Sequence, residues 1–299
     1  MNNRGSLLIA GLWAMSIFSV MTASLTFHSM QSLLEMKRER QGLESKVEFV
    51  SALNEVTSLI QADPLPHEDS PNDLWFGDVK LYQTKRGLEV QMTDEESKIN
   101  LNQAGQSLLN NFFKEFEESV TPLKGSRKDY VKGIVKMRSV KALGTLEDLL
   151  LMENFENEDL ENLRPYLTVY PDSSLINLNT ASPIVISALI NSLQGDHGAS
   201  EVFASKLQEA CKRGRENDVN ARGCLFLSDE LNPERFTVNL KLPKSPEVHG
   251  LEERFLAAVT TDSETFSIRM KSQSGKEARA VFRSREGALR PEVMWWHED

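Results

Sequence analysis

The feature that most constrains this chain is a stretch of 30 residues, Gly5 through Leu34, that contains no Asp, Glu, Lys or Arg. Its apolar part, Leu7 to Phe27, would form a helix about long enough to cross roughly 30 Å of hydrocarbon, since an α-helix rises ~1.5 Å per residue. The sequence therefore predicts a membrane-spanning helix near the N-terminus of a 299-residue chain.

Three kinds of N-terminal segment share this pattern. A cleavable secretory signal needs a site of small residues, which Thr22-Ala23-Ser24 supplies, and an uncleaved signal-anchor helix needs only the apolar run. In the third, Arg4-Gly5 is the end of a leader that stands directly before the apolar run. Such a short leader ending in Gly resembles a type IV prepilin leader, which is cut after the Gly on the cytoplasmic side.

The residues after Leu34 continue as an amphipathic helix. Apolar side chains recur at steps of three, four and seven, and no Pro interrupts before Pro64. This apolar stripe consists of Met36, Leu43, Val47, Val50, Leu53, Val56 and Ile60. The spacing is too irregular for a coiled coil. It predicts one continuous helix from about Ser6 to Gln61, roughly 80 Å long, with its first half in lipid and its second half packed on a folded domain.

Alternating residues predict strands at two places far apart in the sequence. A hairpin is expected where Val79–Tyr82 and Leu88–Met92 flank a turn at Lys85-Arg86-Gly87. The later strands are expected at Phe266–Met270, Ala278–Phe282 and Val293–Trp296. Helical periodicity dominates between about Asp94 and Asn239. The economical interpretation is an α+β fold in which a helical insertion splits one sheet.

Two segments of the insertion resemble each other. The residues of Lys98–Ala104 recur, with changes, in Leu175–Pro183. In the second copy, Ser182 is placed to cap the first turn of a helix. Pro183 occupies the first position of that helix, where the backbone N–H that proline lacks would have no partner within the helix.

The order of motifs along almost the whole chain resembles protein K of the type II secretion system, a minor pseudopilin. The motifs are the short Gly-ended leader, the long helix, Asp94–Asn102, Thr145–Leu149, Arg164–Pro171, Ile176–Pro183 and an arginine-containing last hairpin that ends in Val293-Met294-Trp295. The segment Phe112 to Leu143 departs from the family pattern, because it is mostly basic where the family carries acidic and aromatic residues.

The resemblance implies a pseudopilin fold, a long N-terminal helix packed on a small antiparallel sheet, with a large inserted all-α domain of the SAM-like or helix-hairpin-helix-like kind. The implied domains are a leader (1–5), the transmembrane (6–27) and periplasmic (28–62) halves of the helix, a first sheet segment (63–93), the inserted domain (94–236) and a second sheet segment (237–299).

The function that the resemblance implies is structural and not enzymatic. The chain would be trimmed between Gly5 and Ser6 by the prepilin peptidase and held in the inner membrane with its C-terminal domain in the periplasm. With the minor pseudopilins I and J it would initiate and cap the pseudopilus, which exports folded periplasmic proteins. Other pseudopilins and the inner-membrane assembly platform are further implied partners.

Two sets of helix residues are implied to matter for assembly. After cleavage, Ala10 is the fifth mature residue, where most pilin-like subunits carry Glu. That carboxylate needs a partner in hydrocarbon, taken to be the N-terminal amine of the subunit added before. A subunit with Ala10 needs no predecessor and can be first. Met36, Val47 and Val50 are expected to lie between the helices of neighbouring subunits.

Cys211 and Cys224 are the two cysteines of the chain. In an oxidising periplasm they are expected to pair, with two buried free thiols as the alternative. The region Glu147 to Glu161 contains seven acids and no base. It is compatible with a solvated helix face or with a calcium site, since calcium prefers oxygen ligands, but no ligands can be named.

Two other function classes remain as alternatives. The Asn-x-Asn-Thr-Ala-Ser element resembles the opening of helix-hairpin-helix modules, which favours a membrane-anchored DNA-binding protein of a pilus-like uptake system. Its hairpin would be Leu193–Gly198, where an acid replaces the expected apolar residue. A net charge of −10 argues against binding of nucleic acid, because such binding depends on Lys and Arg that neutralise phosphates. A membrane-tethered hydrolase lacks a Gly-x-Ser-x-Gly or metal motif.

Overall fold

The computed structural model of the chain falls into two compact units, Met1–Ser51 and Ala52–Asp299. Side chains of residues 3–10, 197, 213–217, 228–229, 234 and 298 are not described, although their backbone is. The backbone is described for residues 3–62, 69, 73–75, 81–193, 197–217, 224, 226, 228–243, 245–272, 275–284 and 291–298.

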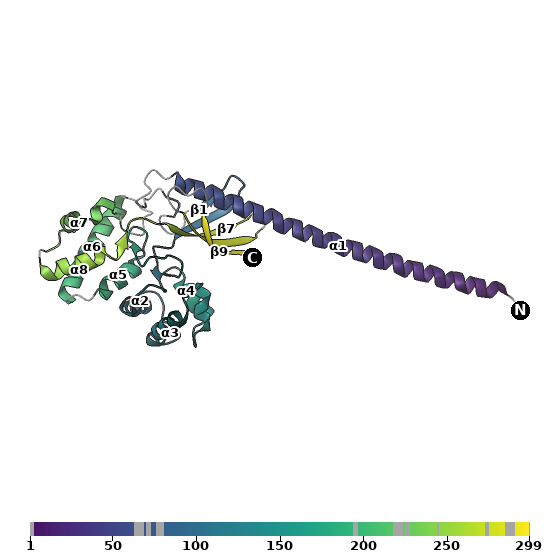
Figure 1. The fold of residues 1–299 in the computed structure, drawn as a ribbon, viewed down its shortest axis with the longest axis horizontal. Coiled ribbons are helices and arrows are strands. Elements are labelled where there is room, and N and C mark those ends of the chain that lie inside the picture. The colour runs from purple at the N-terminus through teal and green to yellow at the C-terminus, as the bar shows by residue number, and fades with distance from the viewer. Residues whose placement is uncertain are drawn as a thin grey trace. The chain divides into compact units, whose positions relative to one another are not determined.

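The first element is one unbroken helix, α1, from Asn3 to Gln61 (Figure 1). Several of its Ser and Thr hydroxyls donate to carbonyl oxygens four residues earlier, as Thr22 does to Phe18 and Thr26 to Thr22, both at 2.8 Å, so these hydroxyls are satisfied within the helix. The predicted continuous helix is confirmed. Its last turns, from Ala52 on, belong to the second unit.

The second unit contains a five-stranded antiparallel sheet with the strand order β1-β2-β7-β8-β9. The strands are β1 Leu81–Gln83, β2 Glu89–Asp94, β7 Thr265–Lys271, β8 Glu277–Arg283 and β9 Glu292–Glu298. Met92 of β2 lies opposite Ile268 of β7, so the two distant parts of the chain meet at the centre of the sheet. The predicted split sheet is confirmed.

The last turns of α1 are tied to the first hairpin. The Tyr82 hydroxyl donates to Glu55 at 2.6 Å, and the Lys85 amide donates to the same carboxylate at 3.2 Å. The turn between β1 and β2 uses Gly87 at φ 79°, a left-handed conformation that glycine adopts without strain. The helix end and the hairpin therefore form one body.

Seven α-helices and two short 3₁₀ helices occupy the described part of the chain between β2 and β7, and the helices gather to one side of the sheet (Figure 1). They are α2 Gln106–Ser119, α3 Arg127–Val140, η1 Leu146–Leu151, α4 Asn157–Leu163, α5 Pro183–Ser192, α6 His197–Asn217, η2 Ser228–Leu231, α7 Pro233–Leu240 and α8 Pro246–Leu256. They share one apolar core, which includes the fully buried Phe112, Phe203 and Phe255.

The helices extend further toward the C-terminus than the sequence predicts. Residues 237–256, which the prediction places with the second part of the sheet, form the end of α7 and all of α8. Ser245 caps α8 by accepting a hydrogen bond from the Val248 amide at 3.3 Å, and Pro246 occupies the first position. Pro246 therefore starts a helix here and does not break one.

The insertion consists of two halves, each closed by a short parallel strand pair. In the first half, β3 Ile99–Asn100 pairs with β4 Leu167–Thr168. In the second half, β5 Ile176–Asn177 pairs with β6 Val259–Thr260. Each of the two similar sequence segments thus begins one half of the insertion. The basic segment 112–143 forms the end of α2, all of α3 and the loops beside it.

Candidate functional site

The repeated motif fixes each half of the insertion through two asparagines. Asn100 and Asn177 each accept a hydrogen bond from the amide two residues later, at 2.9 and 3.0 Å. Asn102 accepts from the Leu143 amide at 2.8 Å, and Asn179 accepts from the Phe226 amide at 2.8 Å. The Asn-x-Asn spacing is therefore a structural device that joins each strand pair to a loop far along the chain.

The two halves differ at the first asparagine. The side-chain amide of Asn100 donates to backbone carbonyl oxygens of Pro171 and Ser173. The side-chain amide of Asn177 lies within hydrogen-bond distance of two carboxyls, Asp69 and Asp94. Only the second half is thus joined to the sheet through acidic side chains at this position.

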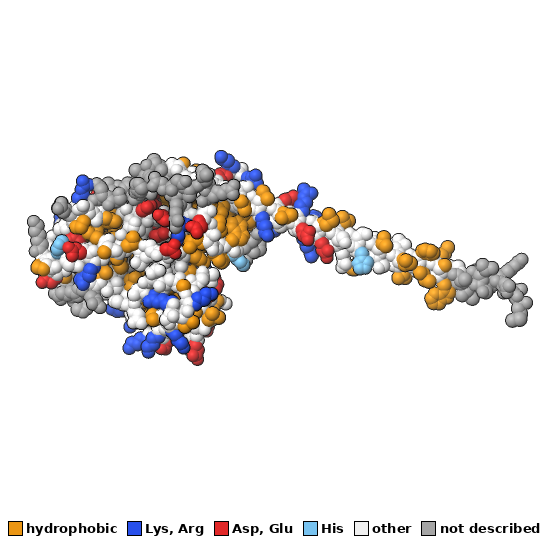
Figure 2. Space-filling view, in the orientation of Figure 1, with side chains coloured by type: hydrophobic (Ala, Val, Ile, Leu, Met, Phe, Trp, Pro, Cys, Tyr) orange, Lys and Arg blue, Asp and Glu red, His pale blue; other side chains and the backbone are white. Residues whose placement is uncertain are grey.

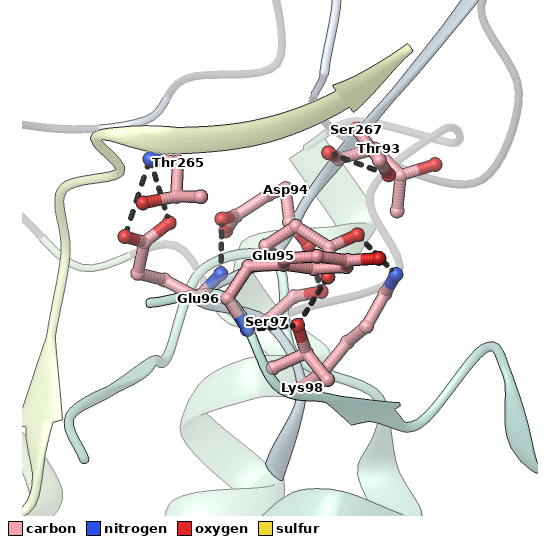
Figure 3. A network of polar contacts seen from close by, with 10 residues as sticks. Thr93, Asp94, Glu95, Glu96, Ser97, Lys98, Thr265 and Ser267 are labelled. Atoms are coloured by element: carbon pink, nitrogen blue, oxygen red, sulfur yellow. Dashed lines mark hydrogen bonds and ion pairs between the residues drawn. The ribbon is translucent and has the colours of Figure 1, made fainter. Parts of the chain in front are cut away.

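Three buried carboxyls, Asp69, Asp94 and Glu96, form a junction between the sheet and the second half of the insertion. Figure 3 shows Asp94 and Glu96 at the end of β2, with Glu96 directed toward Thr265 at the start of β7. The Thr265 amide donates to both oxygens of Glu96, at 3.2 and 3.0 Å. None of the three carboxyl residues is more than 8% exposed.

Hydroxyl and ring donors complete the junction. Ser263 donates to Asp69 at 2.6 Å, and the Trp75 ring nitrogen donates to the other oxygen of the same carboxyl. Thr180, in the repeated motif, donates to Asp94. Segments separated by more than 80 residues in sequence, around Asp94 and Asn177, are thereby held together.

Burial makes these carboxyls hold protons more strongly than carboxyls in water. Burial raises the pKa of Asp94. Burial, followed by the charge of Asp94, raises the pKa values of Asp69 and Glu96 well above their usual range. The protonated forms of these carboxyls are therefore favoured, and the hydrogen bonds of the junction join three parts of the fold.

A neighbouring pair of opposite charges is also buried. The Lys98 ammonium donates to Glu95 at 2.5 Å (Figure 3). Thr168 of β4 donates to the second Glu95 oxygen. Since both side chains are no more than 7% exposed, removing either would leave an unpaired buried charge. The Asp94–Asn102 motif therefore connects the end of β2 to both halves of the insertion: Glu95 bonds to the first half, and Asp94 bonds to the second.

We expect the carboxyl junction to make stability fall as pH rises. The folded state retains protons that the unfolded state releases above about pH 4, so the free energy of unfolding decreases with increasing pH. Glu96→Gln should reduce this slope by up to about 1.4 kcal/mol per pH unit, the value for one proton. Urea unfolding at pH 5 and pH 8 measures it, with exposed Glu153→Gln as the control. Equal slopes for Glu96→Gln and wild type would refute the role of Glu96.

The two cysteines form a disulfide between α6 and the segment before η2. Closing a loop of this size stabilises the folded state by about 3 kcal/mol in the chain-entropy model. Asn179 binds the backbone of Phe226 two residues after Cys224, so the disulfide and the repeated motif hold the same loop.

Several acids between Glu147 and Glu161 are paired with bases. Arg164 contacts Glu147 at 2.9 Å and Glu161 at 3.1 Å, and the Lys124 ammonium lies 2.7 Å from Glu156. Among the described residues, no group of three or more His, Cys, Asp or Glu side chains is arranged to hold a metal ion.

The other expected site residues lie on α1 or in the loop before α6. Met36, Val47 and Val50 are all exposed. Gly5 is described by its backbone alone, and the side chains of Ser6 and Ala10 lie outside the described part of the structure, as does most of the expected hairpin Leu193–Gly198. No helix is apolar enough over a sufficient length to cross a membrane, within the described residues.

The sequence motifs contain part of the junction but do not predict that its residues meet. Asp94 and Asn177 lie in the two motifs that carry the resemblance, yet Asp69 lies in the linker after α1 and Ser263 in the loop before β7. No local pattern distinguishes these two residues. The one usable signal was the density of acids from Asp94 to Glu96 directly after a buried strand.

Comparison with known proteins gives a match at the level of structure. No protein-family model and no curated protein matches the chain. Among solved structures, it matches a chain in the crystal structure of the GspK-GspI-GspJ complex from the type 2 secretion system of enterotoxigenic Escherichia coli. The TM-score is 0.57 at 12% identity, covering 88% of this chain and 99% of that chain. This chain therefore has the fold of a subunit of that complex, which confirms the resemblance to protein K at the level of the fold.

Proposed function

We propose that this chain is a minor pseudopilin of a type II secretion system that assembles with minor pseudopilins I and J at the tip of the pseudopilus. The observation that carries the proposal is the shared fold, since the similarity extends over nearly all of a chain from the GspK-GspI-GspJ complex. The combination of one long helix, a split sheet and a large helical insertion supports the same assignment.

The proposed assembly surface is the exposed apolar part of α1. Met36, Val47 and Val50 are 65%, 58% and 49% exposed. Such side chains on a single helix favour burial against the helices of neighbouring subunits, because apolar area removed from water stabilises the complex. The proposed role of the chain is therefore structural and not enzymatic.

The N-terminal part of α1 is proposed to anchor the chain in the inner membrane, with the second unit in the periplasm. Lys37, Arg38 and Arg40 follow the apolar run, which taken alone would favour the opposite orientation. The proposed orientation places the N-terminus in the cytoplasm, so the peptide bond after Gly5 would be cleaved on the cytoplasmic side.

Mapping the N-terminus of the native protein by mass spectrometry tests this proposal. We expect the mature chain to begin at Ser6, with the whole apolar run retained. A chain that still carries Met1, or that begins after the apolar run, would refute it.

A further inference from the structure

Three lysines form a stripe on the outer face of α3. Lys128, Lys132 and Lys136 follow one another at steps of four residues and are all exposed. Figure 2 shows Lys and Arg side chains gathered over the region that Figure 1 labels α3. Within the described part of the chain, none of the three makes an ion pair.

Two other bases of the same segment are used by the fold. Arg138 points inward, where its guanidinium donates to the carbonyl oxygens of Leu101 and Ala104 at 2.7 and 2.6 Å. Lys124 lies 2.7 Å from Glu156 and 2.8 Å from Glu158. The lysine stripe is therefore a distinct set of charges that the internal contacts of the insertion leave available.

The three charges of the stripe repel one another within their own helix. Like charges four residues apart on a helix repel each other and destabilise it. The segment 112–143 carries eight Lys and Arg against four Asp and Glu, in a chain whose net charge is −10. A local positive surface on an acidic protein attracts an acidic partner and orients it.

We propose that the lysine stripe docks a segment of a partner protein whose carboxylates repeat at one helical turn. Adjacent lysines rise about 6 Å along α3, so such a segment can pair with all three over roughly 12 Å. Val140, one turn beyond Lys136 and 85% exposed, offers an apolar contact at the end of the stripe. This inference is independent of the assembly surface on α1.

A narrow segment fits the charge distribution better than a broad polyanion. Asp129 follows Lys128 in sequence, and Glu118 lies in the last turn of α2; both are exposed. A DNA duplex or an anionic membrane would extend beyond the stripe and meet such acids, whereas a single peptide segment can follow the three lysines alone. The overall charge of −10 adds a long-range repulsion for any large polyanion.

The test uses the full-length chain in a detergent with a neutral headgroup and a fluorescein-labelled, Ala-rich helical peptide with three Glu at every fourth position. We expect the combined variant Lys128→Gln, Lys132→Gln, Lys136→Gln to bind it at least about tenfold more weakly in fluorescence anisotropy. The matched control replaces the exposed Lys85, Arg86 and Lys241 by Gln and should bind like wild type. Raising salt from 50 to 250 mM should weaken the wild-type affinity.

Three outcomes would overturn the proposal. The first is equal affinity of the stripe variant and wild type for the peptide. The second is equal loss of affinity in the Lys85, Arg86 and Lys241 control, which would show a net-charge effect. The third is equal or tighter binding of a 20-base-pair DNA duplex, or of phosphatidylcholine vesicles with 30% phosphatidylglycerol, in a way that depends on the stripe.

Discussion

Replacing Asn177 by Ala is expected to destabilise the folded state by about 3 kcal/mol or more. Asn177 is fully buried, and its amide nitrogen serves two carboxyls and Ser263. Its removal also leaves the Asn179 amide without its acceptor. Chemical unfolding at pH 7 measures the loss, which corresponds to a fall of several degrees in Tm for a domain of this size.

Two control variants give this result its meaning. Asn110→Ala removes an exposed amide that bonds only within its own helix, and it should change stability by no more than about 0.5 kcal/mol. Asn100→Ala removes the equivalent of Asn177 in the first half, where the acceptors are neutral carbonyls. It should cost less than Asn177→Ala, because no buried carboxyl loses a donor. A larger loss for Asn100→Ala would contradict the role assigned to the carboxyl junction.

In the proposed role at the pseudopilus tip, replacing Ala10 by Glu is expected to impair assembly much more than folding. A carboxylate in hydrocarbon costs roughly 2.5–3.5 kcal/mol when it has no partner, and a first subunit has no predecessor to supply one. We therefore expect recovery of the complex with other pseudopilins to fall about tenfold or more. Secretion of an exported protein and co-purification of pseudopilins measure the effect.

Ala10→Ser is the matched control for this change. It keeps a small residue at the same position without adding a charge, so processing and assembly should match wild type. Unaltered secretion together with unaltered complex formation in Ala10→Glu would count against the tip assignment. Loss of the chain from the membrane would show instead that the carboxylate prevents insertion.

The spacing of apolar residues and the positions of Pro and Gly allowed the architecture to be predicted from the sequence. Helix α1 follows from its uncharged run and apolar stripe, and the start of α5 follows from Ser182, whose hydroxyl accepts from the Val185 amide. The same Ser-Pro signal stands at Ser245-Pro246 and marks the start of α8. Strand-like alternation returns only at β7, so the segment between α7 and β7 continues the helical insertion and does not begin the second part of the sheet.

The carboxyl junction could not be predicted because its members are distant in sequence and individually ordinary. Asp69 meets Asn177 across 108 residues and Ser263 across 194. Acidic residues on the surface of a protein look identical in sequence to these, and only the packing of the insertion against the sheet buries them. The stripe on α3 was visible as a basic segment, but its orientation depends on Arg138 turning inward.

The central claim is that this chain joins other pseudopilins through α1. The most direct measurement is mass spectrometry of what co-purifies with the tagged full-length protein from membranes of cells that express the secretion system. We predict that minor pseudopilins I and J are recovered, that the double variant Val47→Asp, Val50→Asp loses them, and that Val238→Asp on the exposed face of α7 keeps them. Recovery of the intact chain without either pseudopilin would contradict the account.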